Sequence, residues 1–379
     1  MDNKKYFLTN EFKEIFIMCK YLFTVILLFI TLNNFVFSQD DQEVTPLPGM
    51  RGTPSNLPDI SVIGDITGKL SSEPTDFDRN KILVREIELA LQGYIYPEIR
   101  ADVFLAMHRH DEHFEPEICE AYVSFLRIIN GLSLKAGKIH VDYGKINKVH
   151  EHHRPYTNQP VALTNFFGKH GLVGEGVTLG YLMPLPLFMQ IDIGAWRLEG
   201  KHHHEEDEEK SLTFGLADEV YTGRLWSSFP LGETSELELG ASVAAAHGSH
   251  YQEHQDNAKV FGVDLTFKLW PSTYERLIFQ NEIFNLHREI PVGKLNRWGF
   301  YSYLGYQFNK YWDAGLRYDW SENAFPENKK TNSLSGIITN RLTETTVIRL
   351  QCDYNFGLKS YNAFLQLVFG IGPHSHPLQ

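Results

Sequence analysis

Residues 346–356 read TVIRLQCDYNF, and apolar and polar side chains alternate along the whole stretch. Ile348 and Leu350 belong to the apolar set, whereas Arg349 and Gln351 belong to the polar set. Successive side chains of a β-strand point to opposite faces of its sheet. The stretch therefore predicts a strand with one apolar face and one polar face.

The same alternation recurs almost to the end of the chain. Segments 261–269 and 311–321 repeat it clearly, and turn-forming residues separate such segments. By this template we predict about sixteen strands. They cover residues 59–70, 82–95, 100–110, 118–129, 132–146, 174–183, 188–200, 212–229, 235–247, 259–270, 276–287, 297–309, 311–322, 332–342, 346–356 and 360–371.

The connections between these segments alternate between tight and long. Up-and-down membrane barrels have short periplasmic turns and longer outer loops, and a closed sheet pairs every backbone group that lipid would leave unpaired. We therefore predict an all-β fold, a closed antiparallel up-and-down transmembrane β-barrel in the outer membrane of a Gram-negative bacterium, with membrane lipid as a partner. A secreted soluble β protein is the alternative. The longer connections are 71–81, 111–117, 147–173, 201–211, 248–258, 288–296 and 323–331.

The first residues read as a targeting segment. A cationic start at Lys20 precedes an apolar run over 21–30 and a polar boundary at Ser38, which is typical of a secretory signal. The run is short for a membrane anchor, which needs about 20 apolar residues. We predict the following organisation: a signal peptide at 1–38 with Met18 as an alternative start, a flexible periplasmic leader at 39–58, the barrel at 59–372, and a short periplasmic tail at 373–379.

Composition excludes several classes of function. The chain has 379 residues and a formal charge of −12, from 35 basic and 47 acidic side chains, which argues against a nucleic-acid partner. It contains no nucleophile elbow, phosphate-binding loop or His-Glu-x-x-His motif, so we predict no enzyme and no certain cofactor. Cys119 and Cys352 are interpreted as small apolar residues within strands.

Histidine is abundant, with 17 in the chain, and most of these residues flank or fill the long connections. Imidazole together with carboxylate is a ligand set for zinc and similar divalent metals. The hypothesis is metal capture by His-rich outer loops, and the alternative is solvated loops that bind no metal. The candidate ligands are His108, His110, His113, His150, His152, His153, His202, His203, His204, His247, His250 and His254.

The longest connection, 147–173, mixes charged residues with an apolar stretch at 161–167. We predict that it folds into the barrel and narrows the pore, and the alternative is a flap packed on the rim. Charged groups at a constriction set the selectivity of a channel. The candidate pore-lining residues are Glu86, Glu88, Lys138, His140, Asp142, Arg154, Arg317, Asp319, Arg349 and Asp353.

Several stretches carry a resemblance to a known family: ELALQGYIYPEIRADVF at 88–104, and the segments 56–65, 120–155, 166–181 and 369–374. They resemble zinc-regulated TonB-dependent outer-membrane receptors, which are similar to the phosphate-selective porins. The resemblance implies a barrel and a link to zinc, and it singles out residues 148–155 as functionally interesting.

A TonB-dependent transporter has about 22 strands and a plugged lumen. The leader 39–58 is too short for a plug, so we expect a passive or loop-gated channel. The predicted function is a porin-like channel for small solutes or ions, including divalent metal such as zinc captured by the His-rich loops. The alternative is a barrel that anchors a surface metal-binding or adhesion protein without transport. Assembly of three barrels is left open.

Overall fold

The computed structural model describes residues 58–110, 113–198, 216, 219–251, 254–290, 293–324 and 330–373. The predicted signal peptide, almost all of the predicted leader and most of the predicted tail lie outside these residues. Among the residues described, no helix is both long and apolar enough to cross a bilayer.

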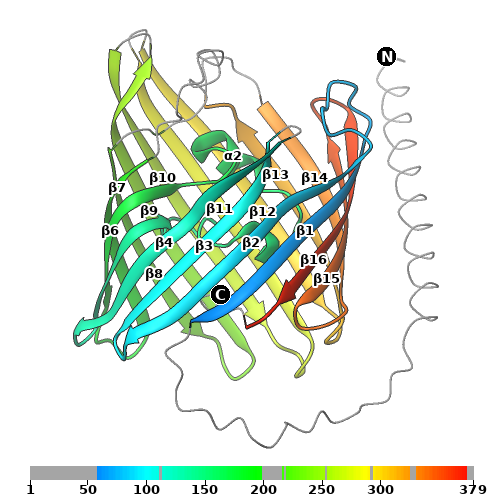
Figure 1. Ribbon diagram of the computed structural model, residues 1–379. Coiled ribbons are helices and arrows are strands. Elements are labelled where there is room, and N and C mark those ends of the chain that lie inside the picture. The colour runs from blue at the N-terminus through cyan, green and yellow to red at the C-terminus, as the bar shows by residue number, and fades with distance from the viewer. Residues whose placement is uncertain are drawn as a thin grey trace, which may run out of the picture. The chain divides into compact units, whose positions relative to one another are not determined.

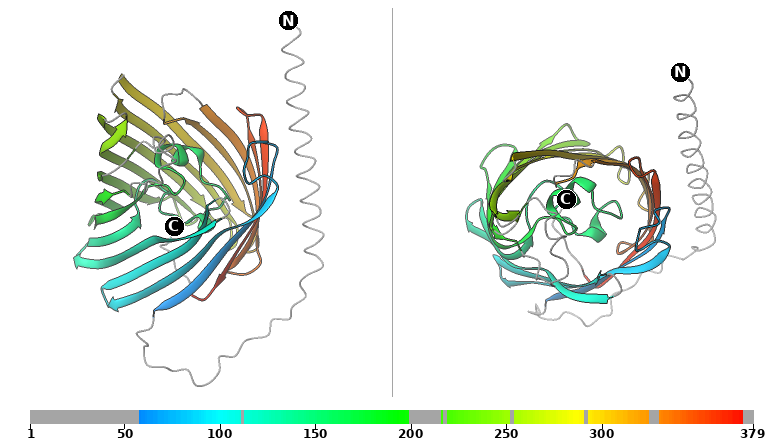
Figure 2. Two further views of the ribbon diagram at one scale, coloured as in Figure 1. Left: turned by 45° about the horizontal axis from the view of Figure 1, so that its top comes forward. Right: turned by 90° about the horizontal axis from the view of Figure 1, so that it is seen from above.

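Sixteen antiparallel strands close into one barrel (Figures 1 and 2). Each strand pairs with the next in sequence, and β1 (Asp59–Ser71) pairs with β16 (Ser360–Ile371) to complete the ring. The sheet therefore has no free edge, and the predicted fold class is confirmed. The other strands are β2 (Lys81–Tyr96), β3 (Ile99–His110), β4 (His113–Ile129), β5 (Leu132–His140), β6 (Val173–Leu182), β7 (Phe188–Arg197), β8 (Glu219–Pro230), β9 (Ser235–Tyr251), β10 (His254–Leu269), β11 (Arg276–Ile290), β12 (Gly293–Gln307), β13 (Trp312–Glu322), β14 (Lys330–Arg341) and β15 (Thr346–Asn355).

The strands are arranged with apolar side chains outward and polar side chains inward. On β13, Leu316 is 57% exposed, whereas its neighbour Arg317 is 1% exposed and Asp319 is fully buried. This is the reverse of a soluble β protein, in which the apolar face is the buried one. An apolar outer skin and a polar interior are what a barrel surrounded by lipid requires.

Three of the predicted long connections proved to be mostly strand, so their predicted boundaries are wrong. The adjoining strands leave only 111–112, 252–253 and 291–292 between them. A polar antiparallel hairpin satisfies its own backbone hydrogen bonds while its side chains stay in water, so polar composition alone does not end a strand.

The predicted strand 132–146 is also too long, because β5 ends at His140. The Val141 amide donates a last cross-strand hydrogen bond to the Leu172 carbonyl, at 3.0 Å. The chain then turns through Gly144, whose φ of +61° favours glycine. The predicted strand 212–229 is matched by β8 from Glu219 onward, and residues 212–215, 217 and 218 lie outside the described residues.

Candidate functional site

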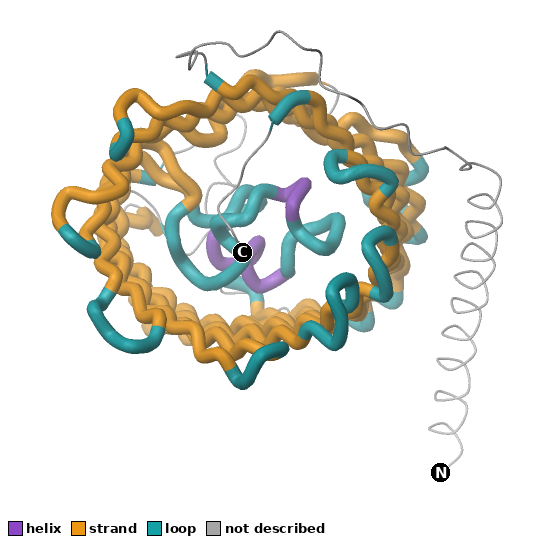
Figure 3. Tube along the Cα trace, turned by 90° about the horizontal axis from the view of Figure 1, so that it is seen from below, coloured by secondary structure: helices purple, strands orange, loops and turns teal. Residues whose placement is uncertain are grey.

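Residues 141–172, here called the inward segment, connect β5 to β6 and lie inside the barrel (Figure 3). Two short helices interrupt it, η1 (Glu151–His153) and α2 (Val161–Phe167). The Gly144 amide donates to Ser242 Oγ on β9 at 3.1 Å, and the Thr157 amide donates to Gln351 Oε1 on β15 at 2.8 Å. The inward segment is thus tied to strands far apart in the ring, and the prediction that this connection folds into the barrel is confirmed.

Glu282 on β11 holds the first turn of the inward segment. Its Oε2 accepts the Lys145 amide at 2.9 Å, and its Oε1 accepts the Ile146 amide at 3.0 Å and the Tyr301 hydroxyl at 2.6 Å. A Cβ added at Gly144 would lie 2.1 Å from Glu282 Oε2, so the close approach requires glycine there. One wall carboxylate therefore fixes both the position and the shape of this turn.

Aromatic packing reinforces the polar anchors. Tyr143 and Phe167 of the inward segment pack on each other, with ring centroids 4.9 Å apart, and against Phe284 of β11, at 6.2 and 6.4 Å. Leu163 and Phe166 of α2 belong to the same buried cluster. Part of the lumen is therefore a packed core rather than water.

Arg317 on β13 is the main cationic anchor. Its Nε lies 2.7 Å from Asp319 Oδ2, and its terminal nitrogens donate to the Asn158 carbonyl at 2.7 Å and to Asn158 Oδ1 at 2.9 Å. The guanidinium lies 4.3 Å from the centroid of the Tyr156 ring. The buried charge of Arg317 is thus neutralised by Asp319 of the same strand, and the remaining donors of Arg317 hold the middle of the inward segment.

The inward segment lies between two cavities. The outer one, of about 480 Å³, adjoins the 72–80 connection and is lined by Glu151 and His170 of the inward segment. The second, of about 340 Å³, lies toward the tight turns and is lined by Lys145 and Lys148 of the same segment. We call them the outer vestibule and the inner vestibule. Residues of the inward segment therefore line both cavities.

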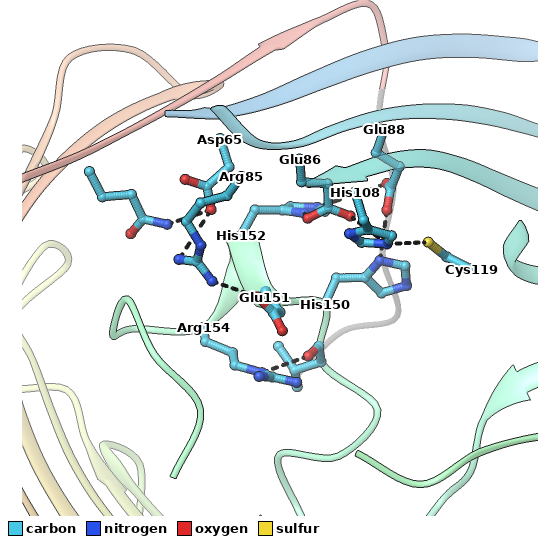
Figure 4. A network of polar contacts seen from close by, with 12 residues as sticks. Asp65, Arg85, Glu86, Glu88, His108, Cys119, His150, Glu151, His152 and Arg154 are labelled. Carbon is cyan, nitrogen blue, oxygen red and sulfur yellow. Dashed lines mark hydrogen bonds and ion pairs between the residues drawn. The ribbon is translucent and has the colours of Figure 1, made fainter. Parts of the chain in front are cut away.

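A row of imidazole and carboxylate groups joins the wall to the inward segment (Figure 4). Glu86 is shared, since its oxygens lie 4.0 Å from His108 Nε2 and 3.8 Å from His152 Nδ1. We call this set the His–Glu row. In order it comprises Cys119, His108, Glu86, His152, Glu88, His150 and Glu120.

The His150 side chain lies between two carboxylates of the barrel wall and is 6% exposed. Its Nδ1 lies 3.0 Å from Glu88 Oε2, and its Nε2 lies 2.8 Å from Glu120 Oε2. Only the imidazolium form donates from both nitrogens. Burial alone would lower the pKa of His150, but its hydrogen bonds to the carboxylates of Glu120 and Glu88 outweigh that effect, and the pKa is raised well above its ordinary value. His150 is therefore a charged clamp whose nitrogens are already engaged.

Glu151 forms the neighbouring clamp, of opposite charge. Arg85 on β2 donates to Glu151 Oε2 at 2.6 Å and to the Thr157 carbonyl at 2.8 Å. Burial alone would raise the pKa of Glu151, but the positive charges of Arg85 and Arg154 lower it to about 2. Both clamps hold η1 against the β1–β4 wall.

The His150 clamp predicts a loss of stability at alkaline pH. A raised native pKa means that its contribution is fully present below the unfolded pKa of about 6.5 and is lost as pH rises through the native value. The difference in melting temperature between the wild type and His150→Gln should therefore shrink as pH rises above about 6.5. Thermal melts of the detergent-solubilised barrel across that range test this, with the exposed His113→Gln as control. A constant difference would contradict the clamp.

The predicted metal-ligating histidines lie in different environments in the structure. His108, His150 and His152 belong to the His–Glu row, whereas His113 and His153 are exposed. The prediction that His150 and His152 lie on the outer rim is wrong, because the connection that carries them folds into the lumen. The remaining side chains lie outside the described part of the chain: His110, His202, His203, His204, His247, His250 and His254.

The predicted pore-lining residues lie on the inner wall or in the inward segment. Glu86 lines the outer vestibule, whereas Arg154 is 2% exposed and donates to the Val149 carbonyl at 2.9 Å, bracing the segment from within. Most of them pack against the inward segment instead of rimming an open channel, so a role in permeation stays a prediction. The wall contributes Glu86, Glu88, Lys138, His140, Arg317, Asp319, Arg349 and Asp353, and the inward segment contributes Asp142 and Arg154.

Several residues of the site were not predicted from the sequence, among them Arg85 and Cys119. The pairing of β1 with β2 skips Arg85, and the pairing of β3 with β4 skips Cys119, so each is the extra residue of a β-bulge. A bulge places two successive side chains on one face. Cys119 and Glu120 are consequently both buried. Cys119 also belongs to a small buried apolar cluster with Ala90, Phe104 and Ala106, in agreement with its interpretation as a small apolar residue within a strand.

Comparison with known proteins was informative at the level of the fold. No family model matches the chain. An uncharacterised protein of Aquifex aeolicus (strain VF5) is 27% identical over 304 residues, which cover 68% of this chain and 62% of that protein. The chain therefore spans about three fifths of the length of that relative.

Solved structures share the architecture at low identity. The anion-selective porin from Comamonas acidovorans has a TM-score of 0.55 and 10% identity, covering 83% of this chain and 100% of its own. OmpT of Vibrio cholerae in its trimer form has a TM-score of 0.50 and 7% identity, covering 83% and 100%. These relatives do not bear on the resemblance to zinc-regulated TonB-dependent receptors or phosphate-selective porins, which stays an expectation from the sequence. The chain has the closed sixteen-stranded barrel fold of the porins of the Gram-negative outer membrane.

Proposed function

We propose that this protein is an outer-membrane channel for small solutes or ions, and that the inward segment narrows its permeation path. The observation that carries the proposal is the inward segment, which crosses a polar lumen and lies between two vestibules. A barrel that served only as an anchor would have no need of a vestibule on each side. The proposed role is passive or gated permeation without catalysis.

The finer part of this proposal is that the channel captures a divalent metal such as zinc on its outer side as cargo. Its support is the His–Glu row, since imidazole and carboxylate are ligands for such metals. Glu86 and His108 of that row line the outer vestibule together with Glu151 and His170 of the inward segment, so a cation that enters this vestibule has these groups within reach.

Assembly of three barrels is a further proposal about the state in which the channel works. Its support is the trimer form described for OmpT of Vibrio cholerae. The mass of the protein extracted in mild detergent tests it, and a monomeric mass would count against it.

Conductance in planar lipid bilayers tests the channel directly. We expect small, ohmic single-channel steps, because a sixteen-stranded barrel leaves an aqueous lumen and the inward segment occupies much of it. Folding of the inserted protein is checked separately by the heat-dependent mobility of the barrel on a denaturing gel. Silence from well-folded protein would overturn the channel and favour a barrel that only anchors surface loops.

A further inference from the structure

Two β-bulges, on the strands β2 and β4 that flank β3, turn side chains toward one place in the lumen. The bulge at Arg85 leaves Glu86 facing inward at the end of the run that pairs β2 with β3, where Glu86 is opposite His108. The bulge at Cys119 turns that thiol inward from β4. Bulges are over-represented beside functional sites, where they re-aim a side chain. Here they bring together a carboxylate, an imidazole and a thiol from three adjacent strands.

The ligand atoms are close enough to share one ion. His108 Nε2 lies 3.1 Å from Cys119 Sγ and 4.0 Å from Glu86 Oε1, and all three atoms fall within 4.8 Å of one another. A tetrahedral zinc site places its ligand atoms about 3.3 to 3.6 Å apart, given metal–ligand distances of about 2.0 to 2.3 Å. A bound ion would draw the Glu86 carboxylate closer, since its Oε1 lies 4.0 Å from His108 Nε2 and all three ligand atoms already lie within 4.8 Å of one another. Glu117 Oε2, 3.8 Å from His108 Nε2, is in reach as a fourth ligand.

The surroundings favour a cation with an affinity for nitrogen and sulfur. A thiolate and an imidazole select borderline metals such as zinc, whereas magnesium and calcium prefer sites made only of oxygen. Two cationic or imidazole groups stand nearby: Lys138 Nζ is 3.5 Å from Glu117 Oε1, and the His170 ring centroid is 5.3 Å from that of His108. Lys138 thus pairs with the carboxylate of Glu117.

We propose that Glu86, His108 and Cys119 form a binding site for one divalent cation of the zinc class at the floor of the outer vestibule (Figure 4). Glu86 and His108 both line that vestibule, so an ion can arrive from the outer side without displacing the inward segment. In the proposed channel, this site would bind the cation before it permeates. The role of the site in transport therefore rests on the proposed function. Binding itself is measurable without transport.

Titration of the folded, chelator-treated full chain in detergent with zinc chloride alone tests the site. We expect the wild type to bind one ion per chain with high affinity. The affinity should be at least about tenfold weaker in Cys119→Ser and in His108→Gln, because each substitution removes one side chain that binds the metal directly. Cobalt in place of zinc should show a thiolate-to-metal charge-transfer absorption that Cys119→Ser abolishes. The matched control Cys352→Ser should bind zinc and cobalt as the wild type does.

A second measurement uses the unmutated chain, so its result does not depend on whether the variants fold. Zinc should slow the alkylation of Cys119 by a small maleimide, read by mass spectrometry, and leave the alkylation of Cys352 unchanged. Unprotected Cys119, or zinc affinity equal in the wild type and both ligand variants, would overturn the site. A chain that conducts without binding zinc would refute this inference alone, whereas a silent chain that binds zinc at Cys119 would refute only the channel.

Discussion

Replacing residues 142–171 by a flexible Gly-Ser linker of about five residues is expected to raise single-channel conductance by about fivefold or more, because an unobstructed barrel of this size is a water-filled pore. The replacement is feasible because His140 and Val173 are directly paired, so a short hairpin loop can join β5 to β6. Recordings in planar bilayers under identical salt measure the effect.

A milder variant separates obstruction from damage to the barrel. Glu282→Gln keeps the size of the side chain but weakens acceptance of the Lys145 and Ile146 amides, and we expect noisier openings of intermediate conductance. The heat-dependent gel mobility of both variants should match that of the wild type. If the linker variant is folded and its conductance is unchanged, the inward segment does not narrow the path.

Arg317→Ala is expected to lower the free energy of unfolding by about 3–5 kcal/mol, the usual effect of breaking a buried ion pair from one side. The substitution leaves Asp319 charged and buried, and it removes both hydrogen bonds to Asn158. Asp319 also accepts the Val161 amide at 3.2 Å, so the start of α2 should loosen with it. Urea unfolding of the barrel in lipid vesicles measures the loss.

Arg127→Ala is the matched control for Arg317→Ala. Arg127 also pairs with a carboxylate, Glu98, but its side chain is 65% exposed, and exposed pairs contribute at most about 1 kcal/mol. Equal losses in the two variants would show that Arg317 is solvated in the folded barrel and does not anchor the inward segment.

The barrel was predictable because its main determinant is local. Each strand carries its own alternation, as in β13, where every second side chain is buried. The predicted ends of strands were less accurate because polar hairpins such as β9–β10 continue the ladder into water. Hydrogen bonding across such a hairpin depends on the partner strand, and the composition of one segment does not report it.

The site was predictable only in part, for a physical reason. An apolar stretch at 161–167 within a charged connection indicated that the connection would leave water, and it does so as α2. The partners of that connection are set by the register of distant strands, so no spacing in the sequence pairs His150 with Glu88 or Arg85 with Glu151. Bulges such as that at Cys119 are likewise invisible, because they reverse the alternation from which facing is inferred.

The pairing of β1 with β16 has a kinetic consequence. Val62 is opposite Ile371, so the ring cannot be sealed until the two ends of the barrel sequence meet. Contacts between residues so remote in sequence carry a large loop-closure entropy and are made late in folding. Until then both terminal strands expose unsatisfied amides and carbonyls that could recruit another polypeptide. The final seam should therefore be the slow step of biogenesis, and an assembly factor that shields it would act there.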